Sequence, residues 1–468
     1  MAATNINASE SNILALAGSS IILLLLSRIA IQASTWSKDR ALLSYFFEDN
    51  SEFILALTVY IPIILLLSVL AVSGEKKYRI VSIFGFLYGT VFWFISYNFT
   101  SGARTIFSQL NGFYPMSKGL ADWMNIPLLV RCRASTGCIY PGIPNGYGNG
   151  WRLLSPLASD GVAVILGGLM TGYVCYAVGR FSERLGVPIV GLMLFLSPSM
   201  VFSIERGQPD IFLVGLILIF LRIKKVRTAA NVLIAMALLS MKPFFVTVFL
   251  RDRPKVSRIL LFSPLFLFTY FFSMNFDFKD VQNVRVATIY WPKSQFGIDQ
   301  LPSLAIQLFD KKYHVNEQYW QGGTSFGLAL MIGLIFFVVV YLISTKSALL
   351  RLKELGLDSL GVYERNVILV FSSLYLLIYL SGSEVAYKTW VVFPVLIISL
   401  RRFLELKERA KPSFIIFMSL ILFGGFAVDI WTLRSIGTFI LAIYCAHIVS
   451  YFYKDTFPLS KIGRIKSG

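Results

Sequence analysis

The chain has 468 residues, of which 56% are hydrophobic and only 15% are charged, and its formal net charge is +18. An ordinary soluble domain carries about 25% charged residues, so this composition excludes a single water-soluble core. The Lys and Arg residues stand between apolar segments and not along one soluble face. This arrangement is typical of a polytopic membrane protein and argues against nucleic-acid binding.

Several apolar stretches have the length of about 18 to 20 residues that a helix needs to cross the hydrocarbon core of a bilayer. Clear examples are 12–31, 53–72, 256–274 and 326–343. The first lacks a basic n-region and a small-residue cleavage site, so we expect a retained span and not a signal peptide. The pattern predicts an all-α membrane helix bundle with about 12–13 transmembrane or re-entrant helices.

Clusters of Lys and Arg alternate with these apolar spans along the sequence. They lie at 76–79, 180–184, 222–227, 251–258, 346–365, 401–411 and 454–466. The positive-inside rule places all of them in the cytoplasm, together with both termini. The outer segments are then 34–52, 100–157, 204–209, 275–325, 382–388 and 430–434. These hold the long polar and Gly/Pro-rich sequence, so we expect a site on the outer side of a plasma (inner) membrane, with the endoplasmic reticulum as the alternative.

Three parts follow from this topology. They are 1–79, with two N-terminal spans; 80–410, the main module with external loops 100–157 and 275–325; and 411–468, a helix pair with a basic cytoplasmic tail. The two His and four Cys are too few and too scattered for a zinc or haem motif, so no metal is expected. Cys132 and Cys138 lie close together in the first external loop, where either a disulfide or two free thiols can exist.

The apolar stretch between the third and fourth basic clusters is interrupted by Lys242-Pro243. Because a proline ends or kinks the helix before it, this stretch predicts two short helices that enter the membrane and return on the same side. Broken backbone at membrane depth is tolerated only inside protein or beside a wet cavity. Lys242 is therefore expected near a functional site.

Asp122 is the only carboxylate between Glu75 and Asp160. An acidic residue beside Trp123 and close to the membrane surface suits the role of a general base. The alternatives are a helix N-cap or an ion-pair partner for a nearby arginine, Arg131 or Arg133.

A short polar turn joins two spans at 204–210 and carries Arg206, Gln208 and Asp210. Ionisable groups at the mouth of a helix bundle are costly unless they are paired or functional. Pro209 fits the first turn of the next helix, and Asp210 is favourable at the positive end of its dipole. A simple surface pair of Arg206 with Glu205 is the alternative.

Lys242 and Lys388 each stand at the edge of, or inside, an apolar run. Lysines in such places commonly extend their ammonium group to the lipid headgroups. Two cations facing the outer side can instead stabilise the phosphate of a lipid-linked sugar, on which negative charge develops as the glycosidic bond breaks.

This set of motifs resembles the GT-C class of integral membrane glycosyltransferases, in particular the polyprenol-phosphate-mannose-dependent mannosyltransferases. The matching motifs are Asp122-Trp123, Tyr140-Pro141 with the following "NGYGNGWRLLSPL", Gly207-Gln208, Lys242-Pro243, and "GIDQLPSLAIQLF" at 297–309. The resemblance covers about residues 80 to 400. One departure is the late span, where the family often has a histidine and this chain has Tyr387-Lys388.

The resemblance implies a helix bundle with a cavity that opens outward and an inverting transfer from a polyprenyl-phosphate sugar to a glycolipid or glycan. Under it, Asp122 takes the proton of the acceptor hydroxyl, and Lys388, Lys242 and Arg206 hold the departing lipid phosphate. The implied cavity-lining residues are Gln208, Asp210, Tyr140 and Tyr387. Neither a cofactor nor a bound nucleotide is expected.

Two other functions compete with this one. A polymerase or ligase of lipid-linked glycans also needs a large external loop and basic residues. A transporter or lipid flippase commonly shows paired repeats with matching broken helices. Only one broken segment is evident here, at Lys242-Pro243, and the long one-sided loops favour an enzyme with an external site.

Overall fold

The computed structural model describes residues 80–97, 120, 122–131, 149–195, 197–273, 295–298, 323–381, 384–405 and 431–454. Helices account for nearly all of this part of the chain. The two expected spans of 1–79, and 411–430 and 455–468 of the C-terminal part, lie outside the described residues.

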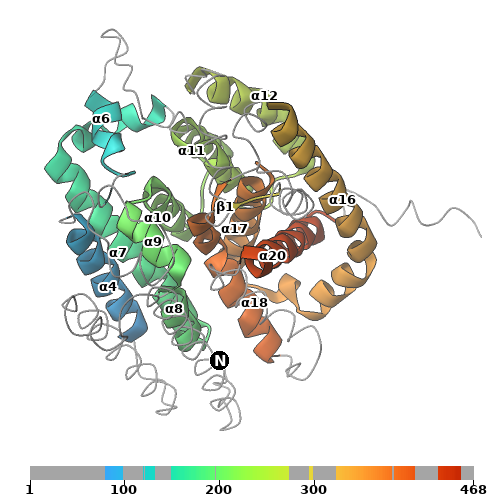
Figure 1. Ribbon diagram of the computed structural model, residues 1–468. Coiled ribbons are helices and arrows are strands. Elements are labelled where there is room, and N and C mark those ends of the chain that lie inside the picture. Colours follow the sequence, from blue (N-terminus) through green and yellow to red (C-terminus); the bar gives the residue numbers. More distant parts are fainter. Residues whose placement is uncertain are drawn as a thin grey trace, which may run out of the picture.

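The described helices form a bundle with two groups (Figure 1). The first group contains α4 (Ile80–Tyr97), α7 (Asp160–Arg184), α8 (Pro188–Phe195), α9 (Pro198–Arg206) and α10 (Pro209–Arg222). The second contains α16 (Gly323–Glu354), α17 (Val362–Leu380), α18 (Phe393–Glu405) and α20 (Trp431–Phe452). Between them lie α11 (Thr228–Met241) and the 3₁₀ helix η4 (Pro243–Leu250), followed by α12 (Val256–Ser273). The two groups share one core, because α17 packs against α10, η4 and α20.

Within the described residues, four helices are long and apolar enough to cross a membrane. They are Asp160–Arg184, Val256–Ser273, Val362–Leu380 and Ser435–Phe452. Large apolar side chains point outward from α12 and α16, among them Leu261, Phe272 and Ile343. Apolar surface of this extent is unusual for a soluble monomer and is typical of helices that contact lipid. The expectation of an all-α membrane protein is therefore confirmed in its coarse form.

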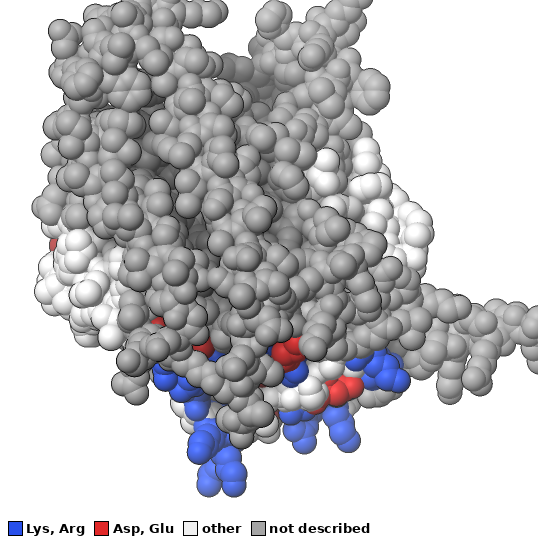
Figure 2. Space-filling model, turned by 90° about the horizontal axis from the view of Figure 1, so that it is seen from below, with Lys and Arg blue, Asp and Glu red and all other residues white. Residues whose placement is uncertain are grey.

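Many of the described Lys and Arg side chains lie at one end of the bundle (Figure 2). Lys and Arg side chains, with a few acidic ones among them, follow one edge in Figure 2. Hydrogen bonds join the helix ends there: Arg401 donates to the Leu185 carbonyl over 2.6 Å, and Asn366 donates to Asp252 over 3.0 Å. Helix ends that are far apart in the sequence thus meet at this end.

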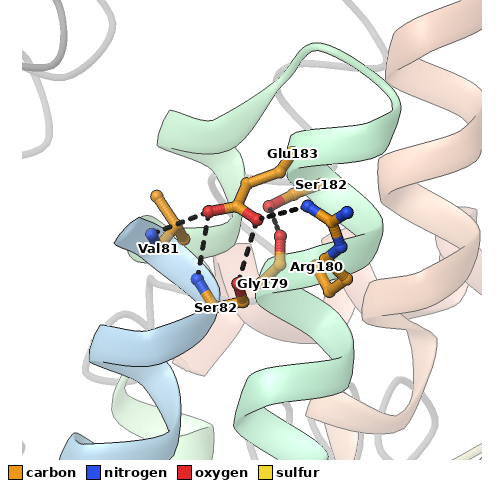
Figure 3. Close-up of polar contacts among 6 residues, drawn as sticks. All are labelled: Val81, Ser82, Gly179, Arg180, Ser182 and Glu183. Carbon is orange, nitrogen blue, oxygen red and sulfur yellow. Dashed lines mark hydrogen bonds and ion pairs between the residues drawn. The ribbon is translucent and has the colours of Figure 1, made fainter. Parts of the chain in front are cut away.

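A carboxylate of α7 closes the first turn of α4 (Figure 3). Glu183 accepts the backbone N–H groups of Val81, over 2.8 Å, and Ser82, over 3.2 Å. It also accepts the Ser82 hydroxyl over 3.0 Å and pairs with Arg180. The first N–H groups of a helix have no partner within it and favour negative charge, so Glu183 fixes the start of α4 against the end of α7.

The same two helices approach so closely that Gly179 has no room for a side chain. A Cβ atom there would lie 2.9 Å from both the Cα atom of Ser82 and the carbonyl oxygen of Val81. Both of these are backbone atoms, so α4 and α7 would have to separate. Small residues at membrane helix interfaces commonly permit such close packing.

We expect Gly179→Ala to lower the free energy of unfolding by about 1 to 3 kcal/mol, because an added methyl group overpacks the interface. The measurement is equilibrium unfolding in mixed detergent micelles. Gly161→Ala on the same helix is the matched control, since a Cβ atom there meets nothing within 4 Å. Equal stability of the two variants would show that the interface can open without cost.

The broken stretch predicted at Lys242-Pro243 is present. Helix α11 ends at Met241, Lys242 adopts an extended conformation, and η4 runs back alongside α11. The side-chain amide of Asn231, near the start of α11, donates to the carbonyl of Phe249 near the end of η4, over 3.1 Å. The chain therefore reverses at Lys242, at the end of the bundle away from the basic clusters.

Segments of the two long loops also lie at this far end. A two-residue strand β1 (Gln295–Phe296) pairs antiparallel with β2 (Glu384–Val385), which directly precedes the 3₁₀ helix η7 (Ala386–Val392). From the first loop, α6 (Asn125–Arg131) packs against the 3₁₀ helices η2 (Asn149–Leu153) and η3 (Ser155–Ala158). Pieces of loops 100–157 and 275–325 thus lie on the same end of the bundle.

Candidate functional site

Ionisable and amide side chains from distant parts of the sequence gather at the end opposite the basic clusters. We call this set the polar cluster and define it as Asp122, Arg206, Gln208, Asp210, Lys242 and Lys388. Its members come from the start of the α6 segment, the α9–α10 turn, the α11–η4 reversal and η7. All six were selected from the sequence as site residues.

Asp122 is held by the α9–α10 turn. Its carboxylate accepts the Arg206 guanidinium through two hydrogen bonds, from Nη2 to Oδ1 over 2.6 Å and from Nε to Oδ2 over 3.1 Å. The Gln208 side-chain amide donates to the same carboxylate. The Asp122 backbone N–H also donates to the Arg206 carbonyl over 3.0 Å. A paired arginine fork of this kind fixes the orientation of a carboxylate as well as its charge.

Gly207 permits this contact. It ends α9 in the left-handed conformation, with φ of 63°, and a Cβ atom there would lie 2.8 Å from that of Trp123. Glycine adopts this conformation without the steric penalty that other residues meet. The turn therefore lies directly against Asp122-Trp123, and the residues on either side of Gly207 both reach the carboxylate.

Aromatic side chains lie behind Asp122 and fix its backbone. The Trp123 indole N–H donates to the Ala163 carbonyl over 2.8 Å. The Trp123 ring contacts the rings of Trp93, Trp151 and Phe212, with centroids 5.4 to 6.0 Å apart. Tryptophan buried in this way supplies a large contact area with few rotatable bonds. Asp122 thus extends from a rigid support.

Asp210 and Lys242 form a second ion pair, with the lysine Nζ 2.5 Å from Asp210 Oδ1. Only 1% of the Asp210 side chain and 7% of the Lys242 side chain are exposed. By contrast, 14% of Asp122 and 30% of Arg206 remain exposed. The outer pair can therefore be reached by a ligand more easily than the inner one. The inner pair joins the start of α10 to the reversal between α11 and η4.

Lys388 is buried in η7, and its ammonium lies 5.6 Å from the centre of the Phe244 ring. Phe244 follows Lys242-Pro243 in η4, and η7 packs against α9, which carries Arg206. A cation over an aromatic face is stabilised by the ring quadrupole. Lys242 and Lys388 are both covered by protein, whereas the alternative interpretation, in which the ammonium groups extend to lipid headgroups, would leave them exposed.

Other predicted contacts differ from what the sequence suggested. Arg131, an alternative partner for Asp122, pairs instead with Asp160, with 2.9 Å between Nη2 and Oδ1. Tyr140, Cys132, Cys138 and Arg133, and the side chain of Tyr387, lie outside the described residues. The ion pair between Asp210 and Lys242 was not predicted. Two opposite charges in neighbouring apolar runs were its signal, since such charges are costly within a membrane unless they pair.

The part of the chain that the structure describes holds no group of three or more His, Cys, Asp or Glu side chains arranged as metal ligands. Comparison with protein-family models, curated proteins and solved structures found no match.

What the polar cluster can do must therefore be argued from its own chemistry. It offers a partly exposed carboxylate in direct contact with a guanidinium, together with two buried ammonium groups. Such a set can accept a proton from one ligand and bind an anionic group of another.

Proposed function

We propose that this chain is an integral membrane glycosyltransferase of the GT-C type. In this proposal it moves mannose or a related sugar from a polyprenyl-phosphate donor to an extracytoplasmic glycolipid or glycan acceptor. The observation that supports it best is the bidentate contact between the Asp122 carboxylate and the Arg206 guanidinium. The carboxylate is a candidate proton acceptor, and the guanidinium is a candidate phosphate ligand. The two groups are in direct contact.

The proposed reaction uses one carboxylate. The acceptor hydroxyl gives its proton to Asp122, and its oxygen forms a bond to the anomeric carbon of the sugar. The bond between that carbon and the phosphate oxygen breaks on the opposite face, and its electron pair leaves with the lipid phosphate. Attack opposite the leaving group inverts the anomeric configuration. A correctly placed general base of this kind typically accelerates a reaction by about 10² to 10⁴.

The cations of the polar cluster receive the charge that develops on the leaving phosphate. We assign this role to Arg206 and Lys388. Lys242 was expected to share it, but a phosphate would have to compete with Asp210 for its ammonium, because the two lie 2.5 Å apart. Lys242 therefore positions the α11–η4 reversal in this proposal. The basic end of the bundle would face the cytoplasm and the polar cluster the outer side.

The test uses the full chain reconstituted in lipid nanodiscs with radiolabelled polyprenyl-phosphate mannose, related lipid-linked sugars and a crude glycolipid and glycan extract. We expect transfer of label from at least one donor. Lys388→Gln should lower the rate by about 10² to 10³, the usual effect of removing one group that stabilises developing charge. Lys454→Gln is the matched control, since Lys454 is exposed and lies at the basic end.

Transport and polymerisation predict different results. A transporter or flippase would move lipid-linked sugar between the leaflets of a vesicle without cleaving it. A polymerase or ligase would act on pyrophosphate-linked glycans and leave the monophosphate donor intact. Folded protein that cleaves none of the donors contradicts the proposed function.

A further inference from the structure

The contact between Asp122 and Arg206 has a consequence for the order in which substrates act. We propose that Arg206 is a clamp that the donor phosphate opens: it holds Asp122 until the donor arrives, and then transfers to the phosphate and frees the carboxylate. This inference rests on the proposed function and concerns the control of the same site.

The geometry supports a clamp because Arg206 donates a hydrogen bond to each oxygen of the Asp122 carboxylate. Arg206 bonds to Oδ1 through Nη2 and to Oδ2 through Nε, and Gln208 adds a donor to Oδ2. An ionised carboxylate has about four acceptor positions, so three of them are filled.

The arginine is placed to change partners. It is the most exposed charged side chain of the two ion pairs, at 30%, while Asp122 behind it is 14% exposed. A guanidinium presents its donors in a planar fork that fits a phosphate as well as it fits a carboxylate. A phosphate entering from the exposed side therefore meets Arg206 first. The inner pair of Asp210 with Lys242 is nearly closed to solvent and offers no comparable exchange.

The carboxylate does not depend on the clamp for its position. Gly207 brings the turn against Trp123, and the Trp123 indole is bonded to α7. The Asp122 backbone N–H donates to the Arg206 carbonyl, and this hydrogen bond involves neither side chain. When the guanidinium moves to the phosphate, Asp122 remains next to it and becomes able to accept the proton of the acceptor. The donor is thus the first substrate, and an acceptor arriving alone meets an occupied base.

Competition of this kind predicts that Asp122 weakens donor binding. Removing its charge by Asp122→Asn should lower the donor Kd by about two- to fivefold, the range expected for a partly exposed ion pair. The measurement is binding of radiolabelled polyprenyl-phosphate mannose, and of sugar-free polyprenyl phosphate, to the full chain in nanodiscs. Asp160→Asn is the matched control, since Asp160 also pairs with an arginine but lies outside the polar cluster.

A second background separates the clamp from simple repulsion between Asp122 and an anionic donor. In an Arg206→Gln chain, Asp122→Asn should leave the donor Kd unchanged, because there is no guanidinium to release. Arg206→Met serves the same purpose if the glutamine variant fails to fold, as judged by size exclusion. A tighter Kd only when Arg206 is present supports the clamp.

Two results would overturn it. One is an unchanged Kd in Asp122→Asn, and the other is a gain in affinity that persists without Arg206. Either result, with sugar transfer intact in the unaltered chain, removes the clamp and leaves the proposed function standing. Absence of donor binding by every folded variant, the unaltered chain included, removes the proposed function as well.

Discussion

Asp122→Asn is expected to slow sugar transfer by about 10² to 10⁴, the contribution of a general base. The asparagine can still accept a hydrogen bond from Arg206, so the turn and its support on Trp123 should keep their geometry. It cannot take up the acceptor proton. The rate is measured with saturating donor in nanodiscs, so that the tighter donor binding expected of this variant does not enter the comparison.

Asp160→Asn is again the control, because its carboxylate belongs to an ion pair about half exposed at the same end of the bundle. Its transfer rate should stay within about twofold of the unaltered chain, as for most surface substitutions. Transfer that survives Asp122→Asn at full rate would keep the glycosyltransferase class and remove Asp122 as its base.

Lys242→Met should lower the free energy of unfolding by about 3 to 5 kcal/mol, since it leaves a buried carboxylate without its partner. Asp210 is 1% exposed and has no other ion pair among the described residues. The loss should appear as a lower midpoint in equilibrium unfolding, followed by tryptophan fluorescence in mixed micelles.

The double variant Asp210→Leu with Lys242→Met tests the cause. Replacing both members of a buried ion pair by apolar residues is often neutral, so most of the lost stability should return. A double variant as unstable as Lys242→Met alone would show that the lysine side chain packs the α11–η4 reversal through its carbon atoms and not through its charge.

Much of the architecture follows from hydropathy and charge. Apart from closed barrels, only helices form hydrogen bonds with every one of their backbone groups inside a bilayer. Long apolar runs therefore predict helices directly. The topology drawn from the basic clusters stays a prediction, whereas Pro243 correctly predicts the break at the end of α11. The antiparallel contact of β1 with β2 was not foreseen, because two-residue strands carry no periodicity that a sequence can show.

The composition of the site was easier to predict than its pairing. Charged residues in apolar surroundings are rare enough to be selected one by one, as Asp122 and Lys242 were. Which charges pair depends on how helices that are distant in sequence pack together. The sequence alone does not show the spatial distance between their side chains. Asp122 therefore lies against Arg206 and not against Arg131, which is nearer along the chain.

The inner ion pair also bears on how the chain enters the membrane. A lysine in an apolar hairpin is costly to insert into the membrane when it has no counter-charge. The ribosome delivers Asp210 before Lys242, and the α10 helix that carries it precedes the hairpin directly. We therefore expect Asp210 to be available as the counter-charge when the α11–η4 hairpin inserts. Biogenesis of this region is thus ordered from its N-terminal side, with α10 acting as the acceptor for the segment that follows it.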